Sequence, residues 1–544
     1  MKKIFHVIVF FIVFACSVGQ AAKLAIGEGQ SPRNLNPLVI KFAVEQRLKS
    51  LVFKSMMGYD YQERPVPILF QNSDTNSDDL MEWKFKIAPG IKWNDGVDVS
   101  AVDFDFSRGV IANSASRSIY REFVTNIRSI SELQDGEFNI TFLRTVERPT
   151  EMLYFPIVPR HKFDDRTRHI SENGEFGLIP EMTVGCGPYV FKAREGAFNR
   201  IMFERFEQYF GGWGDLPDKT GPFDPAPERI DKIVVEVIED PVLLRQALMQ
   251  GRFHLLPEVR SEDLELLTNT PTTKIKEYPR LTFSSFVYNM GESGNQFISE
   301  YKKVRQAIDM VIDRSGNLRQ IYNIGEDIMS PDMSQILPGG PYIDGGNLDL
   351  SYRPYDMELA KRMLSELGFE RGSDGILEKH GVKFEVRLVT HTRDNSMEQV
   401  CQRFVSNLEE LGVKVDFQHM ELIQYESEVV NDRKFDIAFE EFWFEKNQKI
   451  VRELFYSSSA NNFIGYNNPD LDRLCDRISN LPDMDDELSA RSEIHSILHD
   501  DVPYSFLFYL PSYAGYSHNR LKNFDPKGHD FYDDINLWYM VPEW

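Results

Sequence analysis

Short runs with a two-residue hydrophobic period recur along the chain and predict strands. In the segment from 82 to 87, Trp83, Phe85 and Ile87 alternate with polar residues, as a half-buried strand requires. A glycine-rich turn, TVGCGP, leads into another such run at Tyr189. The same reasoning predicts strands near residues 23–29, 138–143, 230–238, 281–289, 382–390 and 413–420.

Runs with a helical period separate these strands. Ser100, with Asp103 three residues later, is a variant of the capping box and predicts a helix start. Gly251, Gly368 and Gly412 follow periodic segments and predict helix ends. We expect helices near residues 45–57, 241–250, 303–313, 356–367 and 395–411. This alternation of strands and helices predicts an α/β fold with partly parallel, mixed sheets.

The first residues predict an export signal. Lys2 and Lys3 precede an apolar run at 4–15, which is too short to span a membrane, and a small-residue cleavage pattern follows it. We therefore predict a signal peptide over residues 1–22 and a periplasmic mature chain. Lipid anchoring at Cys16 is the alternative, but Phe14 fits such a site poorly.

Length, charge and cysteine content restrict the class of protein. A chain of 544 residues predicts two or three domains, and its net charge of −23 disfavours nucleic acid as a partner. Cys186, Cys401 and Cys475 are far apart and form no C-x-x-C pair, so they do not indicate a disulfide scaffold. We expect buried free thiols, with one disulfide among the three as the alternative.

Motifs for catalysis or metal binding are weak. His495 and His499 have the spacing of a zinc pair, but no third ligand is evident and an exposed helix end explains them as well. Cys186 would need a base and an orienting partner to act as a nucleophile, and the turn alone explains its glycine neighbours. We expect no cofactor, no metal ion and no catalytic residue.

Six separated blocks resemble extracellular solute-binding proteins of family 5, which serve oligopeptide- and dipeptide-type ABC importers. TVGCGPYVF resembles the family's glycine-proline-tyrosine block, with Cys186 in place of the usual Thr or Ser. The block at 230–254 ends in His254 where aspartate is usual. The other blocks lie at residues 81–107, 302–314, 355–369 and 463–476, in the family's order.

The resemblance implies a two-lobed fold like that of type II periplasmic binding proteins, with an inserted domain and a hinge between the lobes. It also implies a monomer that delivers its ligand to the membrane subunits of an ABC permease. The implied boundaries are residues 23–65, 180–279 and 505–544 for lobe I, 66–179 for the inserted subdomain and 280–504 for lobe II.

The same resemblance implies which residues line the ligand cleft. The aspartate that commonly anchors the ligand amine is absent, and Glu441 and Glu445 are the nearest acidic substitutes, with Trp443 as an apolar wall. Arg393 would pair with a ligand carboxylate, although a solvated loop arginine explains it as well. The remaining candidates are Asn34, Asn36, Tyr288, Asn289, Asn461, Asn462 and Tyr466. Turn and cap chemistry explains the asparagines equally well.

We therefore expect a binding protein that captures peptides or peptide-like solutes by closing its hinge, and not an enzyme. The missing aspartate leaves open an ordinary peptide, a modified peptide or another metabolite. The alternative is an exported hydrolase that acts on peptides or glycans and depends on Cys186 or Glu441. A binding fold reused as a sensor or chaperone is a third interpretation.

Overall fold

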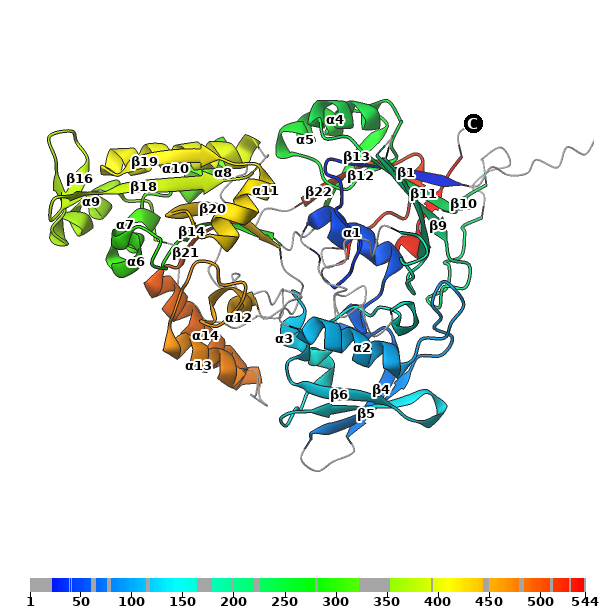
Figure 1. Cartoon of the computed structure of the whole chain (residues 1–544). Helices are drawn as coiled ribbons and strands as arrows, with labels where there is room; N and C mark the ends of the chain where they lie inside the picture. The colour runs from blue at the N-terminus through cyan, green and yellow to red at the C-terminus, as the bar shows by residue number, and fades with distance from the viewer. Residues whose placement is uncertain are drawn as a thin grey trace, which may run out of the picture.

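The computed structural model has two lobes, each built on its own β-sheet (Figure 1). We call lobe I the part built on the seven-stranded sheet and lobe II the part built on the five-stranded sheet. The structure describes residues 22–38, 40, 42–59, 65–75, 80–113, 118–163, 179–196, 199–218, 226–278, 282–321, 353–392, 395–443, 450–478, 484–508, 512–527 and 530–542. The two-lobed, mixed α/β class predicted from the sequence is confirmed.

The sheet of lobe I is mixed. β1 (Lys23–Glu28) lies parallel to β11 (Lys232–Val237) and to β12 (Leu255–Leu256). On its other side, β11 pairs in antiparallel fashion with β9 (Arg200–Arg205). The strand order is β13 (Thr273–Tyr278), β22 (Ser512–Ser517), β12, β1, β11, β9 (Arg200–Arg205) and β8 (Tyr189–Glu195). A smaller sheet pairs β10 (Glu228–Arg229), β24 (Tyr539–Met540) and β23 (Leu521–Lys522).

Helices cover both faces of this sheet. α1 (Ala43–Val52) packs on the face of the main core, where Leu48 joins Leu24 and Ile26 of β1. α4 (Pro241–Met249) and α5 (Leu264–Thr268) lie on the opposite face and bury a separate cluster that includes Leu244 and Leu248. Successive side chains of β1 therefore pack alternately into these two cores, as expected for a strand buried on both sides.

α1 ends earlier than its hydrophobic pattern predicted. The prediction continued the helix to Met57, but the helix stops at Val52, and Phe53 has an extended backbone. The carbonyl of Val52 accepts the Gly187 N–H at 2.7 Å, so the turn before β8 takes the bond that would have continued the helix. Met57 lies instead in β2 (Met57–Tyr59), which pairs with β3 (Pro65–Pro67).

His254 joins two strands of lobe I. Its backbone N–H donates to the Ala25 carbonyl at 2.8 Å, and its ring Nδ1 accepts the Ala25 N–H at 3.1 Å. An aspartate carboxylate could accept the same N–H, which explains how histidine replaces it. Burial, together with the positive charges of Arg520 and Lys23, lowers the pKa of His254 to about 4, so the ring is neutral near pH 7.

A four-stranded antiparallel sheet extends lobe I (Figure 1). Its order is β4 (Phe70–Thr75), β5 (Glu82–Ile87), β7 (Glu137–Phe142) and β6 (Ile127–Glu132), with α2 (Ala101–Ala112) and α3 (Arg121–Val124) beside it. Phe138 contacts the rings of Phe85 and Phe104 with centroids 5.4 and 5.2 Å apart. These rings belong to the same buried cluster as the main lobe I core, so the four-stranded sheet and lobe I are packed together.

The sheet of lobe II is also mixed, with helices on both faces. The strand order is β19 (Lys414–His419), β18 (Glu385–Thr390), β20 (Ile437–Trp443), β14 (Thr282–Tyr288) and β21 (Tyr504–Phe508). One face packs on α7 (Lys302–Asp309), α9 (Met357–Glu366) and α10 (Asn395–Leu411). The other face packs on α11 (Leu422–Tyr425), α12 (Ile450–Phe455), α13 (Pro469–Ile478) and α14 (Met484–Asp501).

The remaining elements of lobe II are short. They are α6 (Gln296–Glu300), α8 (Arg314–Gln320) and the sheet of β15 (Glu370–Arg371), β16 (Leu377–Lys379) and β17 (Val382–Lys383). α7 was predicted to run to Asp313 but ends at Asp309, because Asp313 caps the next helix and accepts the Gly316 N–H at 2.8 Å. The helix predicted at 395–411 is confirmed as α10.

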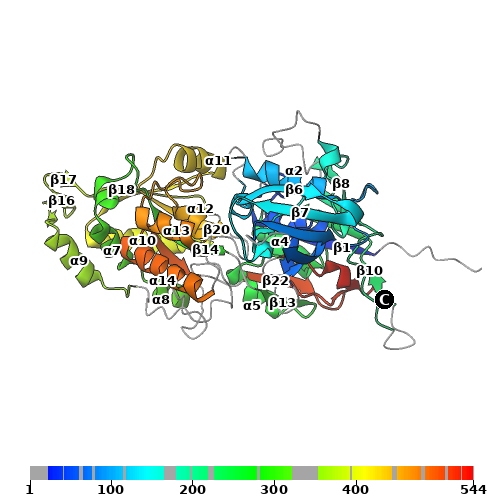
Figure 2. The ribbon, with the colours of Figure 1, turned by 90° about the horizontal axis from the view of Figure 1, so that it is seen from below.

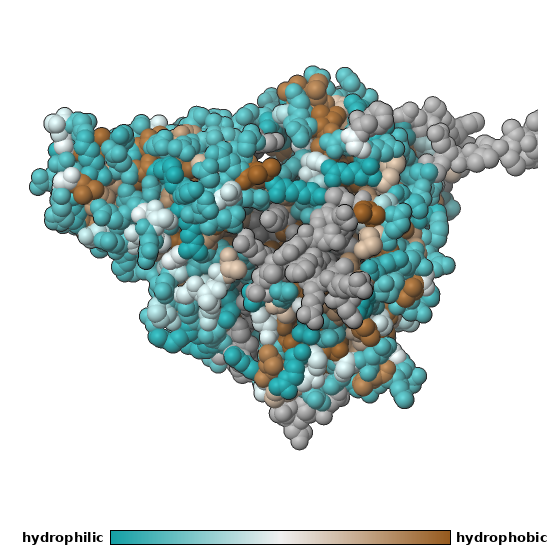
Figure 3. All heavy atoms as spheres, in the orientation of Figure 1, coloured by the Kyte–Doolittle hydropathy of each residue, from teal (hydrophilic) through white to brown (hydrophobic). Residues whose placement is uncertain are grey.

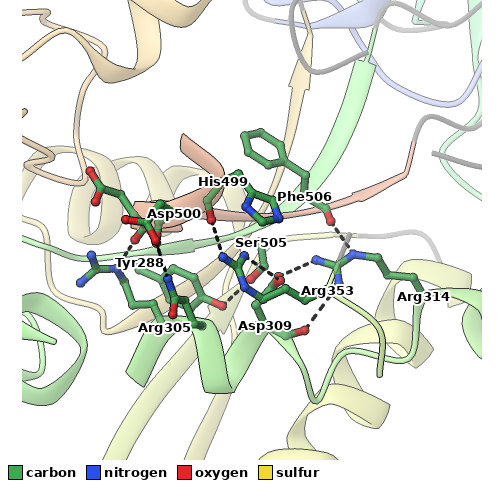
Figure 4. A network of polar contacts seen from close by, with 11 residues as sticks. Tyr288, Arg305, Asp309, Arg314, Arg353, His499, Asp500, Ser505 and Phe506 are labelled. Carbon is green, nitrogen blue, oxygen red and sulfur yellow. Dashed lines mark hydrogen bonds and ion pairs between the residues drawn. The ribbon is translucent and has the colours of Figure 1, made fainter. Parts of the chain in front are cut away.

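A polar network holds the carboxyl end of α14 against α7 and β21 (Figure 4). Arg305 donates to the carbonyl of Asp501 at 2.8 Å, and Arg353 donates to that of His499 at 2.7 Å. Arg314 donates to the carbonyl of Phe506 in β21 at 2.7 Å and pairs with Asp309 at 2.6 Å. Cations at a helix carboxyl end are favoured by the helix dipole, so Arg305 and Arg353 stabilise the end of α14, while Arg314 ties β21 to α7.

Only two links join the described strands of one lobe to those of the other. β13 of lobe I is followed by β14 of lobe II, and β21 of lobe II is followed by β22 of lobe I. The strands that flank these links are paired in both lobes, since Tyr278 pairs with Ser512 in lobe I and Ser284 pairs with Phe508 in lobe II. Figure 2 shows the two lobes side by side, with β14 of lobe II and β22 of lobe I on the sides that face each other. The domain boundaries given above remain predictions.

Candidate ligand-binding site

The parallel strands of both lobes end towards the space between the lobes. In Figure 1, β1 runs from the outer side of lobe I towards lobe II, and β18, parallel to β19 and β20, runs from the outer side of lobe II towards lobe I. Figure 3 shows that the surface is hollowed between the lobes. In open α/β sheets, ligands bind outside the carboxyl ends of the strands, so this hollow is the candidate site.

One ion pair bridges the two lobes beside this hollow. The guanidinium of Arg33, in the loop after β1, lies 3.2 Å from the carboxylate of Glu426, which directly follows α11. Glu45 at the start of α1 shapes that loop, because its carboxylate accepts the Arg33 N–H at 2.9 Å and the Phe42 N–H at 3.3 Å. The contact shows that the loop after β1 and the end of α11 face each other across the gap.

A cavity of about 240 Å³ lies at the carboxyl ends of β1 and β12 in lobe I. Arg47 of α1 donates two hydrogen bonds, of 2.7 and 3.1 Å, to the carboxylate of buried Glu28, and its guanidinium lies 3.4 Å from the carboxylate of Glu258. Burial raises the pKa of the Glu28 carboxyl; Arg47 lowers it, and the negative charge of Glu258 adds to the rise. One arginine is therefore shared between two carboxylates that repel each other.

A second polar cluster lies at the carboxyl end of β18 and β20 in lobe II. His391 lies 3.7 Å from the Glu440 carboxylate, and its ring packs edge-on against Tyr425, with centroids 4.5 Å apart. Burial acts to lower the pKa of His391, but Glu440 and Glu441 outweigh it, so the pKa is raised. The Tyr504 side chain is buried in the lobe II core beside these strands, and its hydroxyl has no hydrogen-bond partner among the described residues.

The two predicted asparagines of the first loop make turns. The Asn34 side-chain oxygen accepts the Asn36 N–H at 2.8 Å, and that of Asn36 accepts the Leu38 N–H at 3.0 Å. Both contacts are Asx turns of the kind that short polar side chains form with nearby backbone. The loop lies at the candidate site, but these side-chain oxygens are engaged in holding its shape.

Tyr288 and Asn289 are buried within lobe II. The Tyr288 hydroxyl lies 2.6 Å from that of Ser505, and Asn289 donates to the carbonyls of Arg433 and Phe435, both at 2.9 Å. Burial raises the pKa of Tyr288, so its hydroxyl stays protonated. The structure therefore places these two residues inside the lobe and away from the hollow between lobes.

Asn461, Asn462 and Tyr466 form a compact turn before α13. Asn461 donates to the Glu453 carboxylate at 2.6 Å, and Asn462 donates to the Tyr466 carbonyl at 2.7 Å. The Tyr466 hydroxyl donates to Asp501 at 2.7 Å. The structure brings these three residues together, and all three side chains hydrogen-bond within lobe II.

The acidic segment at the end of β20 is described in part. Glu441 lies next to Glu440 in β20, is half-buried and pairs in register with Ser284 of β14. Trp443 ends that strand, opposite Thr282. Arg393 and Glu445 lie outside the described residues. Glu441 and Trp443 therefore lie on the edge that faces lobe I, and their contact with a ligand remains a proposal.

The cysteines and the predicted His495 and His499 pair give no sign of a catalytic or metal site in the described part of the chain. Cys186, Cys401 and Cys475 are buried and not disulfide-bonded, as predicted. Burial raises the pKa of the Cys186 thiol to about 12, which disfavours the nucleophilic thiolate. No group of three or more His, Cys, Asp or Glu side chains in those ranges is arranged to hold a metal ion. Nor is any helix there long and apolar enough to cross a membrane.

Sequence reasoning missed the charged residues that the fold brings together. Glu28, Arg47 and Glu258 come from the first strand, the first helix and the loop after β12, and the sequence gives no sign that they meet. Glu440 lies on β20 and His391 directly follows β18, its parallel neighbour, so a prediction of the β18–β20 pairing would have suggested them. The two adjacent glutamates, Glu440 and Glu441, were the feature of the sequence that could have indicated this polar cluster.

Comparison with known proteins identifies the class and then the family. The profile of bacterial extracellular solute-binding proteins, family 5 (middle region), matches residues 64–462. The chain therefore belongs to this family of solute-binding proteins of ABC importers. It is 23% identical over 535 residues to the oligopeptide-binding protein AppA of Bacillus subtilis, which covers 96% of this chain and 92% of that protein.

Solved structures show the same fold. The Bacillus subtilis AppA structure in complex with a nonapeptide matches with a TM-score of 0.80 at 20% identity, over 96% of this chain and 100% of that one. NikZ from Campylobacter jejuni in complex with Ni(L-His) matches with a TM-score of 0.78 at 19% identity, over 95% and 99%. The periplasmic EDTA-binding protein EppA matches with a TM-score of 0.79 at 16% identity, over 96% and 97%.

Proposed function

We propose that this chain is the substrate-binding component of an ABC importer and captures peptides or peptide-like solutes between its two lobes. The protein acts in the periplasm as a monomer, after removal of residues 1–22, and delivers its cargo unaltered to a membrane permease. Glu441 and Trp443 contribute to the lobe II wall of the site, and Arg393 and Glu445 are further ligand contacts that the sequence predicts.

The observation that carries this proposal is that the chain passes between two otherwise separate sheets at two connections, β13 to β14 and β21 to β22. Such a pair of connections forms a hinge about which rigid lobes rotate, and each lobe has its own buried core. A ligand that contacts both lobes binds the closed state more tightly and shifts the population towards it. The ion pair of Arg33 and Glu426 lies where such a closure brings the lobes together.

The peptide-like cargo is supported by the relatives and by the chemistry of the site. The AppA structure carries a nonapeptide, whereas NikZ and EppA are described with a nickel complex and EDTA, so the fold itself does not select the ligand. In this chain both facing edges carry carboxylates, together with Arg47 on one and His391 on the other. Fixed charges of both signs suit the charged termini and side chains of peptides.

Native mass spectrometry of the protein as purified tests the proposal. We expect a population with a bound peptide or peptide-like compound, and a saturable rise in Tm when peptides are added to protein stripped by partial unfolding. The peptide recovered after incubation should have its original mass, which separates binding from hydrolysis. A retained metal chelate with no response to any peptide would contradict the peptide assignment.

A further inference from the structure

One apolar side chain on lobe II is unusually exposed to solvent. Ile423 of α11 is 76% exposed, the largest fraction for a large hydrophobic side chain in the described ranges, and Leu243 of α4 follows at 55%. Gln424 and Glu426, close to it in the chain, are polar. Isolated apolar residues are normal on a protein surface, so the surroundings of Ile423 decide whether it has a role.

The helix that carries Ile423 is fixed to lobe II. Tyr425 and Val429 are both buried in the lobe II core, and the Tyr425 ring packs edge-on against His391. These two buried residues lie four positions apart and mark the side of the helical segment that faces the core. Ile423 and Glu426 lie three positions apart and share the opposite side. The exposure of Ile423 is therefore a property of a packed helix and not of a loose loop.

The outer side of α11 borders the hollow between the lobes. Glu426, on this side, already contacts lobe I through its ion pair with Arg33, at 3.2 Å. α11 also begins at Leu422, shortly after β19 ends at His419, so it lies at the carboxyl end of the parallel strands of lobe II. Figures 1 and 2 both show α11 on the part of lobe II nearest to lobe I. Because ligands bind at this end of the strands, Ile423 lies at the candidate site.

Lobe I presents a stacked pair of side chains on the other side of the gap. The guanidinium of Arg33 lies over the ring of Phe42, with its central carbon 4.8 Å from the ring centroid. The Glu45 carboxylate accepts the backbone N–H groups of both residues, at 2.9 and 3.3 Å, so the loop that carries the pair is fixed. A guanidinium is weakly hydrated and an aromatic ring is largely apolar, so an apolar group can pack against them.

We propose that Ile423 forms a subsite for an apolar side chain of the captured peptide, which packs between Ile423 on lobe II and the stacked Arg33 and Phe42 on lobe I. The assignment rests on the proposed function, since the occupant is part of the captured peptide. When the lobes close, an aliphatic side chain at this place leaves water on both sides, so its burial favours binding, whereas a hydroxyl-bearing side chain gains less. Ile423 is thus a specificity-determining residue.

The test compares an apolar residue of the peptide with a polar one. Two peptide libraries of equal lengths differ only in that each peptide of the first contains a leucine where the second has a serine. Both are offered to the wild type, I423S, I423L and V382S, and retained peptides are quantified by mass spectrometry. V382S is the matched control, because Val382 of β17 is also exposed, at 45%, and its strand lies at the end of lobe II away from lobe I (Figure 2).

We expect the wild type, I423L and V382S to retain leucine peptides about tenfold more than serine peptides, and I423S to lose most of that preference. Equal retention of both libraries by the wild type, or a full preference in I423S, would overturn the subsite while leaving peptide capture intact. If I423S retained less of both libraries with its preference unchanged, Ile423 would pack on lobe I and not on the ligand, which also overturns the subsite. Retention of no peptide by the wild type would refute peptide capture, and the subsite with it.

Discussion

Replacing His254 with phenylalanine removes one hydrogen-bond acceptor from the junction of β1 and β12. The ring Nδ1 accepts the Ala25 N–H at 3.1 Å in a buried position, so phenylalanine leaves that N–H without a partner. An unsatisfied buried donor costs about 1–3 kcal/mol, and we expect this loss in the free energy of unfolding of H254F near pH 7. H254N keeps an acceptor at the same place and should lose less.

The pH dependence provides the sharper test. The pKa of His254 is about 4 in the folded protein, below the ordinary value of 6.5. Because the folded pKa is lowered, the folded state binds fewer protons, and the stability due to the neutral ring is complete above pH 6.5 and is lost as the pH falls towards 4. The shift corresponds to about 3 kcal/mol. H254N does not titrate there and keeps its contribution.

The assay is urea unfolding followed by circular dichroism at several pH values, with the wild type, H254F and H254N measured side by side. The free energy of unfolding of the wild type minus that of H254F should fall by up to about 3 kcal/mol between pH 7 and pH 4. The free energy of unfolding of H254N minus that of H254F should stay the same over this range. Because all other titrating groups are shared, they cancel in the differences. If the difference between wild type and H254F is the same at both pH values, His254 is not a neutral acceptor and the reasoning fails.

Three further substitutions test the packing and the contact between lobes. In G185A the added Cβ would lie 1.9 Å from the Val52 carbonyl oxygen, so we expect a loss of about 1–3 kcal/mol in thermal unfolding, whereas G196A, which meets open space, should be neutral. R47M leaves buried Glu28 unpaired and should cost about 3–5 kcal/mol in urea, and the double variant R47M/E28L should recover much of it. R33A removes an exposed ion pair between the lobes that is worth at most about 1 kcal/mol. Because salt screens exposed charges, the radius of gyration of the ligand-free protein should increase slightly at low salt and not at high salt. An equal increase at high salt would refute an ionic contact.

Local signals predicted many of the elements. Ser100 and Asp103 form the capping box expected of them, with the Ser100 N–H donating to the Asp103 carboxylate at 2.9 Å. Gly251 and Gly412 have the positive φ that a helix end favours, +75° and +107°. Such features depend on neighbours in sequence, and therefore the sequence is enough to find them.

The end of α1 and the charged clusters could not be predicted in this way. Val52 looks like the middle of an amphipathic helix, and only the Gly187 N–H, which arrives from a distant turn, shows why the helix stops. Glu28 and Glu258 meet because β1 and β12 are neighbours in the sheet, which no local pattern reveals. Asn34 and Asn36 are different, because the Asx turns that they form depend only on residues nearby in the sequence, and turn chemistry was one of the two interpretations given for them.

Small-angle X-ray scattering with and without a bound peptide tests the central claim most directly. With a peptide first shown by calorimetry to saturate the protein, the account predicts a smaller radius of gyration and a shorter maximum dimension, because the two lobes rotate about the β13–β14 and β21–β22 links. Identical scattering curves at saturation would contradict capture by hinge closure.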